Sequence, residues 1–186
     1  MFIQRVAYGV SPVELLVSFF GGDKMYKVND KIIYKRDVCI IKEIKEKLYN
    51  NTDYYIISPL TDESLTINIP INSPAIKRPL TKQEALSIIE LIPSIKAIDS
   101  TEKSLENLYK ELLSTEDEKD LICIIKTTYL RNKQRLDNGK KLGDKDEKYF
   151  QKAENFLYNS LALSLEMTYD ECKDYIIKYI NNKEVK

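Results

Sequence analysis

The 186-residue sequence contains no histidine and no tryptophan, and it has only five glycines. Without histidine the chain lacks the usual proton shuttle at neutral pH and the commonest neutral metal ligand, which excludes His-containing triads and His-based zinc sites. The glycines form no G-x-G-x-x-G or Walker pattern, so a phosphate-binding loop of that kind is excluded. We therefore expect a protein that is not an enzyme and that holds no cofactor and no metal.

Cysteine is also scarce, and the charges cancel. Cys39, Cys123 and Cys172 lie far apart and form no C-x-x-C pair, a pattern typical of reduced, buried thiols, so we expect a cytoplasmic location. Lys+Arg and Asp+Glu both total 29, and the formal net charge is zero. Because overall charge cannot attract nucleic acid here, any DNA contact has to come from a local patch.

Residues 1–24 form a separate segment whose apolar run, 13–20, is interrupted by Glu14. The run is too short to span a bilayer and no signal-peptide cleavage pattern follows it, so no membrane association is expected. The letters GGDKM at 21–25 match a translated purine-rich ribosome-binding site followed by a start codon. We therefore expect Met25 to be the true start and 1–24 to be a non-native or upstream-translated leader.

The front half is rich in β-branched and aromatic residues and is broken by turn-forming residues at short intervals. This pattern predicts strands over 31–34, 38–44, 54–58 and 65–69. Strict alternation in the last run places Leu65, Ile67 and Ile69 on one buried face. Four or five short strands in so few residues favour a small SH3/Tudor-like β-barrel over 25–79, an architecture more typical of binding than of catalysis.

From Pro79 onward the apolar residues recur at three- and four-residue steps, which predicts helices. Capping boxes begin helices at Thr81 and Thr115, Asp144 begins another, and Thr168 caps the last. We expect a connecting helix and linker over 80–99 and an all-α helical bundle over 100–186, so the fold class is α+β. The acidic clusters 116–118 and 144–147 are interpreted as helix-capping rather than catalytic groups.

The stretch 126–152 carries an excess of positive charge in a chain with none overall. Four acids oppose nine cations, which gives a local charge of +5; the cations are Lys126, Arg131, Lys133, Arg135, Lys140, Lys141, Lys145, Lys148 and Lys152. Such a patch is able to meet phosphates. A solvated helix face is the alternative interpretation, since charge runs are often only that.

Several segments resemble one known family. The letters KVNDKIIY at 27–34, YYIISPL at 54–60 and LTINIP at 65–70 are similar to strands of the polymerase-interacting domain of the CarD/CdnL family. In the back half, TYLR at 128–131 and LALSL at 161–165, with 141–148 between them, resemble its helical domain. The resemblance covers roughly 25–180, in order, and implies a bacterial transcription regulator that binds RNA polymerase.

The resemblance implies that the barrel docks on the polymerase β subunit through an exposed strand edge and two basic positions. These positions fall on Lys47 and on Asn68, which stands where the family has arginine. Because that charge is lost, docking is expected either to be weaker or to use Arg36 or Lys45 instead. The chain is expected to act as a monomer.

The same resemblance implies that the helical domain contacts promoter DNA near the transcription bubble and modulates the stability of the open complex. The family inserts a tryptophan there as a wedge; this chain has none, and Leu105 is the nearest position. The expected phosphate contacts are non-specific and come from Lys110, Arg131, Lys140, Lys141 and Lys148. The alternative is a protein-interaction adaptor without DNA contact.

Overall fold

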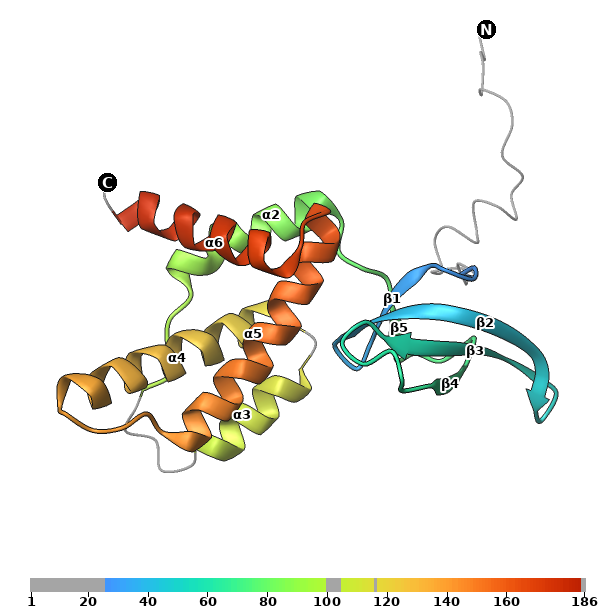
Figure 1. Cartoon of the computed structure of the whole chain (residues 1–186), viewed down its shortest axis with the longest axis horizontal. Helices are drawn as coiled ribbons and strands as arrows, with labels where there is room; N and C mark the ends of the chain where they lie inside the picture. The colour runs from blue at the N-terminus through green and yellow to red at the C-terminus, as the bar shows by residue number, and fades with distance from the viewer. Residues whose placement is uncertain (1–25, 100–104, 116, 185–186) are drawn as a thin grey trace, which may run out of the picture.

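The computed structural model describes residues 26–99, 105–115 and 117–184, and these form a mixed α+β chain (Figure 1). The expected leader, 1–24, and Met25 lie outside the described residues. Five strands come first: β1 (Lys31–Tyr34), β2 (Asp37–Tyr49), β3 (Thr52–Pro59), β4 (Ile67–Pro70) and β5 (Ile76–Lys77). The described helices follow: α2 (Lys82–Leu91), the 3-10 helix η1 (Ile92–Ser94), α3 (Leu105–Ser114), α4 (Glu118–Asp137), α5 (Asp144–Leu165) and α6 (Tyr169–Glu184).

The strands form one antiparallel sheet in the order β4-β3-β2-β1-β5. The sheet is not closed, so β4 and β5 are its edges among the described strands. The short strand β5, which pairs with β1 through two residues, was not predicted from the sequence. The prediction that the last strand begins at Leu65 was wrong, because the Leu65 N–H donates to the Asp62 carbonyl in a turn and the strand starts at Ile67.

Two hairpins of this sheet have two-residue loops with positive φ at both positions. The φ angles are 48° at Lys35 and 73° at Arg36 between β1 and β2, and 49° at Asn50 and 58° at Asn51 between β2 and β3. This conformation matches the twist of the strands in a type I′ turn and favours asparagine or glycine. Asn50 and Asn51 suit it, whereas Lys35 and Arg36 do not, so intrinsic preference does not explain the β1–β2 turn.

Strand β2 bends where its pairing with β3 shifts, between Ile41 and Glu43 and again between Lys45 and Tyr49. Lys47 lies in the second irregularity, with a φ of 50° and its N–H donating to Asp53 Oδ1 at 2.9 Å. Bulges of this kind increase the local twist of a strand. Figure 1 shows the result as a long, strongly curved β2.

The core of the sheet is small and lies on one of its faces. Cross-strand pairs join Ile32 to Cys39, Ile41 to Ile57 and Tyr55 to Ile69, and all six of these side chains are buried in one cluster. Aromatic and β-branched pairs of this type are the main side-chain stabilisation of a sheet. We call residues 26–77 the sheet module.

The helices begin largely where their capping residues predict. Thr81 and Glu84 form a capping box at α2, and Thr168 and Glu171 exchange the corresponding hydrogen bonds before α6. The predicted capping box at Thr115 was wrong. Asp117 caps α4 instead, its side chain accepting from the Lys119 N–H.

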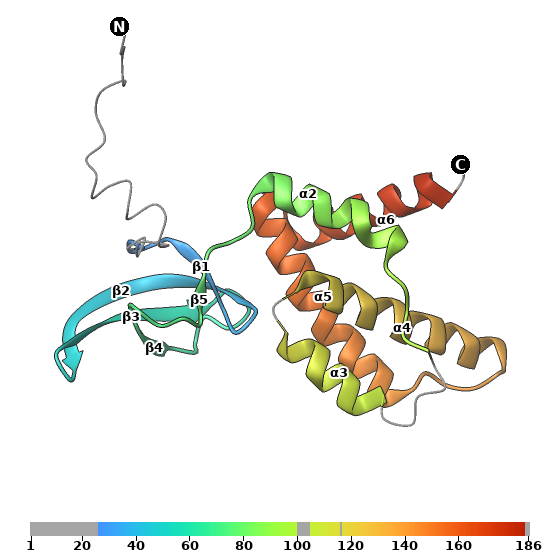
Figure 2. The ribbon, with the colours of Figure 1, turned by 180° about the vertical axis from the view of Figure 1, so that it is seen from behind.

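A second, larger core joins the helices. Sixteen buried residues from α2, η1, α3, α4, α5 and α6 form it, and none of them belongs to the sheet core. Helix α5 supplies the most, including Ala153, Leu157, Leu161 and Leu165 as its periodicity predicts. We call residues 82–184 the helical module, and Figures 1 and 2 show it on one side of the sheet, joined through the linker 78–81.

Candidate functional site

One candidate surface is the exposed edge of the sheet at β4. Asn68 lies on this edge strand and pairs with Ile56 of β3 on its inner side. Along the same rows of the sheet, Ile56 pairs with Glu43 and Tyr54 pairs with Lys45. Because opposed residues share a face and alternate residues return to it, Lys45 and Asn68 lie on the same face, opposite the sheet core.

The side chains of that surface are available to solvent. Lys45, Lys47 and Asn68 are all exposed, and Lys45 lies 3.6 Å from Glu43 in a surface ion pair that contributes little. We call Lys45, Lys47, Asn68 and the outer backbone of β4 the edge surface. Of the four residues expected to bind polymerase, Lys45 and Asn68 are placed on one face by the strand register, and Lys47 is exposed in the irregular part of β2.

Arg36, the fourth, lies at the β1–β2 turn and points toward the helices instead. Its Nε donates to the Leu113 carbonyl and its Nη2 to Thr115 Oγ1, each at 3.0 Å. Leu113 is in the last turn of α3, where carbonyls lack helical partners and a cation is favourable. We call this contact region the seam between the two modules.

The helical module uses four of the nine cations of 126–152 within its own fold. Lys126 donates to the carbonyls of Ile92 and Ile95, and Arg135 donates to the Lys141 carbonyl at 2.8 Å. Arg131, expected to contact DNA, instead pairs with Asp146 at 3.0 Å. Lys145 is the fourth, and its partner is Glu106 at 2.6 Å.

Asp146 was expected to cap α5 but is a buried polar centre. Its Oδ2 accepts from Arg131 Nε and its Oδ1 accepts from the Tyr109 hydroxyl at 3.3 Å. Burial, with the nearby Asp146 carboxylate, raises the pKa of Tyr109, so the hydroxyl remains a donor at neutral pH. The centre joins α3, α4 and α5 and is best interpreted as structural.

A second charged cluster lies on the surface between α3 and α5. Lys110, another expected DNA contact, pairs with Glu106 one turn earlier in α3 at 3.1 Å, and Lys145 reaches the same carboxylate from α5. Hydrogen bonds from Lys145 and, to a smaller extent, from Lys110 lower the pKa of Glu106 to about 2. Leu105, the expected wedge position, is half-buried and packs against the helical core.

Apart from the paired Lys145, the exposed cations of the stretch lie in the loop between α4 and α5 or on the adjoining turns of these helices. They are Lys133, Lys140, Lys141, Lys148 and Lys152. Lys140 and Lys141 stand in the loop itself, and the Lys140 N–H donates to the Arg135 carbonyl at 2.8 Å, which orders the backbone there. We call these five residues the lysine surface; three of the expected phosphate contacts belong to it.

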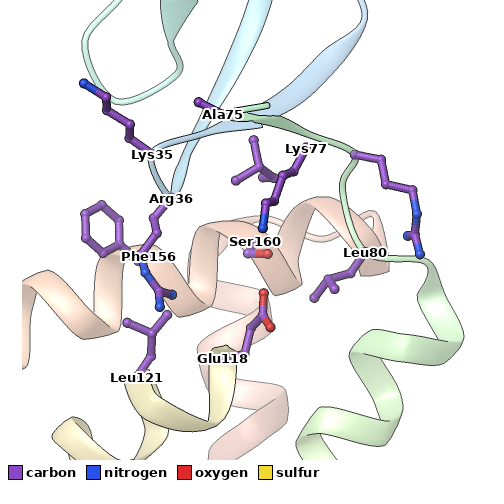
Figure 3. Close-up of a pocket in the computed structure, with 11 residues that line it drawn as sticks. Lys35, Arg36, Ala75, Lys77, Leu80, Glu118, Leu121, Phe156 and Ser160 are labelled. Carbon is purple, nitrogen blue, oxygen red and sulfur yellow. The ribbon is translucent and has the colours of Figure 1, made fainter. Parts of the chain in front are cut away.

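A crevice of about 350 Å³ runs along the seam (Figure 3). Lys77 and Arg36 enter it from the sheet module, whereas Glu118 and Ser160 face them from α4 and α5 (Figure 3). Apolar side chains complete the walls, among them Leu121 and Phe156. The two modules thus meet across a gap rather than through a continuous core.

A larger hollow of about 640 Å³ lies within the helical module, between α4 and α6. Its walls are mostly apolar and include Ile125, Ile176 and Ile180. Tyr129 and Leu130 of α4 also line this hollow, and they are 58% and 53% exposed. We call this hollow the apolar groove; exposed apolar residues gathered in one place are typical of contact surfaces.

Two of the three cysteines are buried in the cores. Burial raises the pKa of Cys39 to about 12 and that of Cys172 to about 11, so both thiols are protonated at neutral pH. Residues 26–99, 105–115 and 117–184 contain no cluster of three Cys, Asp or Glu side chains suited to a metal ion. None of the helices in those ranges has the length and apolarity needed to cross a membrane.

Sequence reasoning missed the contacts of Arg36 and the burial of Asp146. Asp146 falls on the apolar stripe of α5, three residues before Tyr149 and seven before Ala153, so its periodicity was a usable signal. For Arg36 the only local signal is a charged side chain in a turn that favours asparagine or glycine.

No family model matches the chain, and no curated protein matches it.

Proposed function

We propose that this chain is a transcription regulator of the CarD/CdnL type. In this proposal the sheet module is a small SH3/Tudor-like unit that binds the RNA polymerase β subunit, and the helical module is a bundle that contacts promoter DNA near the transcription bubble. The chain acts by changing the stability of the open complex and performs no catalysis. The proposal rests on the resemblance of the sequence segments and on the two surfaces described above.

The edge surface is the observation that carries the proposal. An exposed edge strand offers unpaired backbone donors and acceptors to a partner, and side chains on the adjacent face add specificity. Here β4 is such an edge, and Lys45 and Asn68 share one exposed face beside it. Arg36 is not included, because its guanidinium donates to the helical module.

The lysine surface supports the second half of the proposal. Five exposed lysines give weak, salt-dependent affinity for free DNA, and the exposed Asp137 and Asp144 beside them weaken it further. Tethering to polymerase raises the effective concentration of promoter DNA, so weak contacts become sufficient. The isolated chain is therefore expected to bind DNA poorly.

Capture of the polymerase tests the first half. We expect the immobilised chain to retain purified β subunit. The Lys45→Glu, Asn68→Glu double variant should retain at least about tenfold less, because it adds negative charge and removes the side-chain donors at both positions. Lys31→Glu is the matched control, since Lys31 is an exposed strand residue away from β4 and should retain the subunit. Equal retention by both variants would remove the edge surface from the interface.

The lifetime of the open promoter complex tests the second half. Replacing Lys140 and Lys141 by glutamate should abolish the effect of the chain on that lifetime while leaving capture of the β subunit unchanged. The control carries the same change of charge at Lys82 and Lys96, which are exposed outside the lysine surface. A double variant at Lys140 and Lys141 that acts like the unmodified chain would exclude DNA contact through this loop.

The apolar groove favours a second candidate, a protein-interaction adaptor without DNA contact. Tyr129 and Leu130 expose apolar surface beside a hollow that another protein segment can fill. In that case Leu130→Glu abolishes function, whereas the lysine variants have no effect. The opposite pattern supports the transcription regulator.

A further inference from the structure

The β1–β2 turn has a conformation that its own residues do not favour. Lys35 and Arg36 both have positive φ, where asparagine or glycine is the usual choice. Unfavourable backbone conformations persist when surrounding contacts fix them. We therefore expect contacts of the Arg36 side chain outside the turn to hold this conformation.

Arg36 makes a set of contacts across the seam. Its Nε donates to the Leu113 carbonyl and its Nη2 to Thr115 Oγ1, both at 3.0 Å, and Nη2 also lies 3.5 Å from the Asp117 carbonyl. One guanidinium thus binds the end of α3, the connection and the cap residue of α4. The planar fork of arginine suits this arrangement of acceptors, whereas lysine offers a single point charge.

The electrostatics of the seam favour the same contact. Burial lowers the pKa of Arg36, and the carboxylates of Glu118 and Asp120 oppose that shift, so the side chain stays charged. Figure 3 shows Arg36 pointing from the turn toward Leu121 and Phe156 of the helices, whereas Lys35 beside it points away. Of these two neighbouring cations, Arg36 is the one that donates hydrogen bonds to the end of α3 and to Thr115.

Part of the seam is an open crevice. The two buried cores share no residue, and a crevice of about 350 Å³ separates part of the sheet from α4 and α5. In the linker, Arg78 makes a two-pronged ion pair with Glu84 of α2, with contacts of 2.7 and 2.8 Å. This pair joins the linker to the start of the helical module.

From these observations we infer that Arg36 is a positioning residue, an intramolecular latch that sets the orientation of the sheet module relative to the helical module. Without it the modules move about the linker and the seam opens. The latch fixes where the lysine surface lies relative to the edge surface. The inference goes beyond the proposed function, because it requires neither polymerase nor DNA.

The distance between the modules in the isolated full chain tests the latch. Spin labels are placed at Glu46→Cys in β2 and Lys152→Cys in α5, both exposed, with Cys123→Ser; Cys39 and Cys172 are buried and do not react. The chain with Arg36 intact should give one narrow distance distribution. Arg36→Ala should at least roughly double its width, as expected for a released hinge.

Two further test variants and one control keep the test decisive if Arg36→Ala folds poorly. Thr115→Val removes one acceptor from the helical side and should also broaden the distribution, whereas Lys35→Ala, in the same turn, should leave it narrow. Arg36→Lys should broaden it, because the fork is lost although the charge remains. Distributions that stay narrow in Arg36→Ala or, where that variant is unfolded, in Thr115→Val and Arg36→Lys would overturn the latch without bearing on polymerase binding.

Discussion

The sheet module and the helical module differ in the kind of group that they offer to a partner. The sheet module has a core of six buried residues and presents an edge strand, so in the proposal above it offers backbone groups to its partner. The helical module has sixteen core residues and presents lysine side chains. Backbone sites depend on the fold that holds them, whereas side-chain sites tolerate changes that leave the fold intact.

The two modules also differ in how they use their charges. Arg131, Arg135 and Lys145 hold helices and loops together, so part of the positive stretch is structural. In the sheet module Lys45 and Lys47 remain on the surface. A sum of charges along the sequence therefore overstates the lysine surface and says little about the edge surface.

The largest expected effect is a separation of the two cores by mutation. Ile57 is fully buried in the sheet core, and Ile57→Ala should lower the stability of the sheet module by about 3 kcal/mol through lost burial and a cavity. Hydrogen exchange should show strand amides losing protection while α5 amides keep it. Leu161→Ala should produce the reverse pattern, because Leu161 is fully buried in the helical core.

The control for these substitutions is Leu65→Ala. Leu65 is 47% exposed, so its truncation should cost less than about 1 kcal/mol and leave both patterns of exchange unchanged. Loss of protection in α5 caused by Ile57→Ala would contradict the independence of the two cores. It would mean that sheet and helices unfold as one unit.

A second effect concerns the buried carboxylate of the helical module. Asp146→Ala leaves the partly buried Arg131 without its 3.0 Å partner and removes the acceptor of the Tyr109 hydroxyl. We expect a loss of about 2 kcal/mol in the free energy of unfolding, measured by urea denaturation. Asp144→Ala, at an exposed site in the same first turn, should cost no more than about 0.5 kcal/mol.

Thiol labelling sharpens the comparison through one buried cysteine in each module. Cys39 lies in the sheet core and Cys172 in the helical core, and neither reacts unless its module opens. Because the sheet core is smaller, Cys39 should be labelled roughly tenfold faster than Cys172. Half-buried Cys123 should react before both, and equal rates at Cys39 and Cys172 would indicate joint opening.

The smallest effect is a pH dependence confined to the helical module. The pKa of Glu106 falls from 4.5 to about 2 through its contacts with Lys145 and Lys110. Because the folded-state pKa is depressed, this carboxylate contributes stability above about pH 4.5, and the contribution is lost as the pH falls toward 2. Glu106→Gln should flatten the loss of stability of the helical module in that window, measured by urea unfolding at several pH values. An unchanged slope of stability against pH would mean that the contacts of Glu106 with Lys145 and Lys110 do not stabilise the module.

Local signals in the sequence predicted much of the fold. The β-branched runs located β1, the first half of β2 and the centre of β3, and the capping boxes at Thr81 and Thr168 located α2 and α6. These features are set by residues close together in the chain. The start of β4 was missed because Asp62 accepts hydrogen bonds from Ser64 and forms a turn that competes with the strand.

Long-range contacts explain most of what was not predicted. Thr115 looked like a capping residue, but its hydroxyl accepts from Arg36, 79 residues away, and donates to the Leu112 carbonyl. Arg131 looked like a free cation, but its partner Asp146 belongs to the next helix. Residue type and spacing cannot show such pairings, because they depend on how the helices pack.

Footprinting of promoter DNA tests the central claim most directly, namely that the sheet module brings the helical module to DNA through polymerase. The account predicts extra protection at the edge of the transcription bubble only when chain and polymerase are both present. It also predicts that the Lys45→Glu, Asn68→Glu variant loses this protection. Equal protection by the chain alone, or by the edge variant with polymerase, would contradict the account.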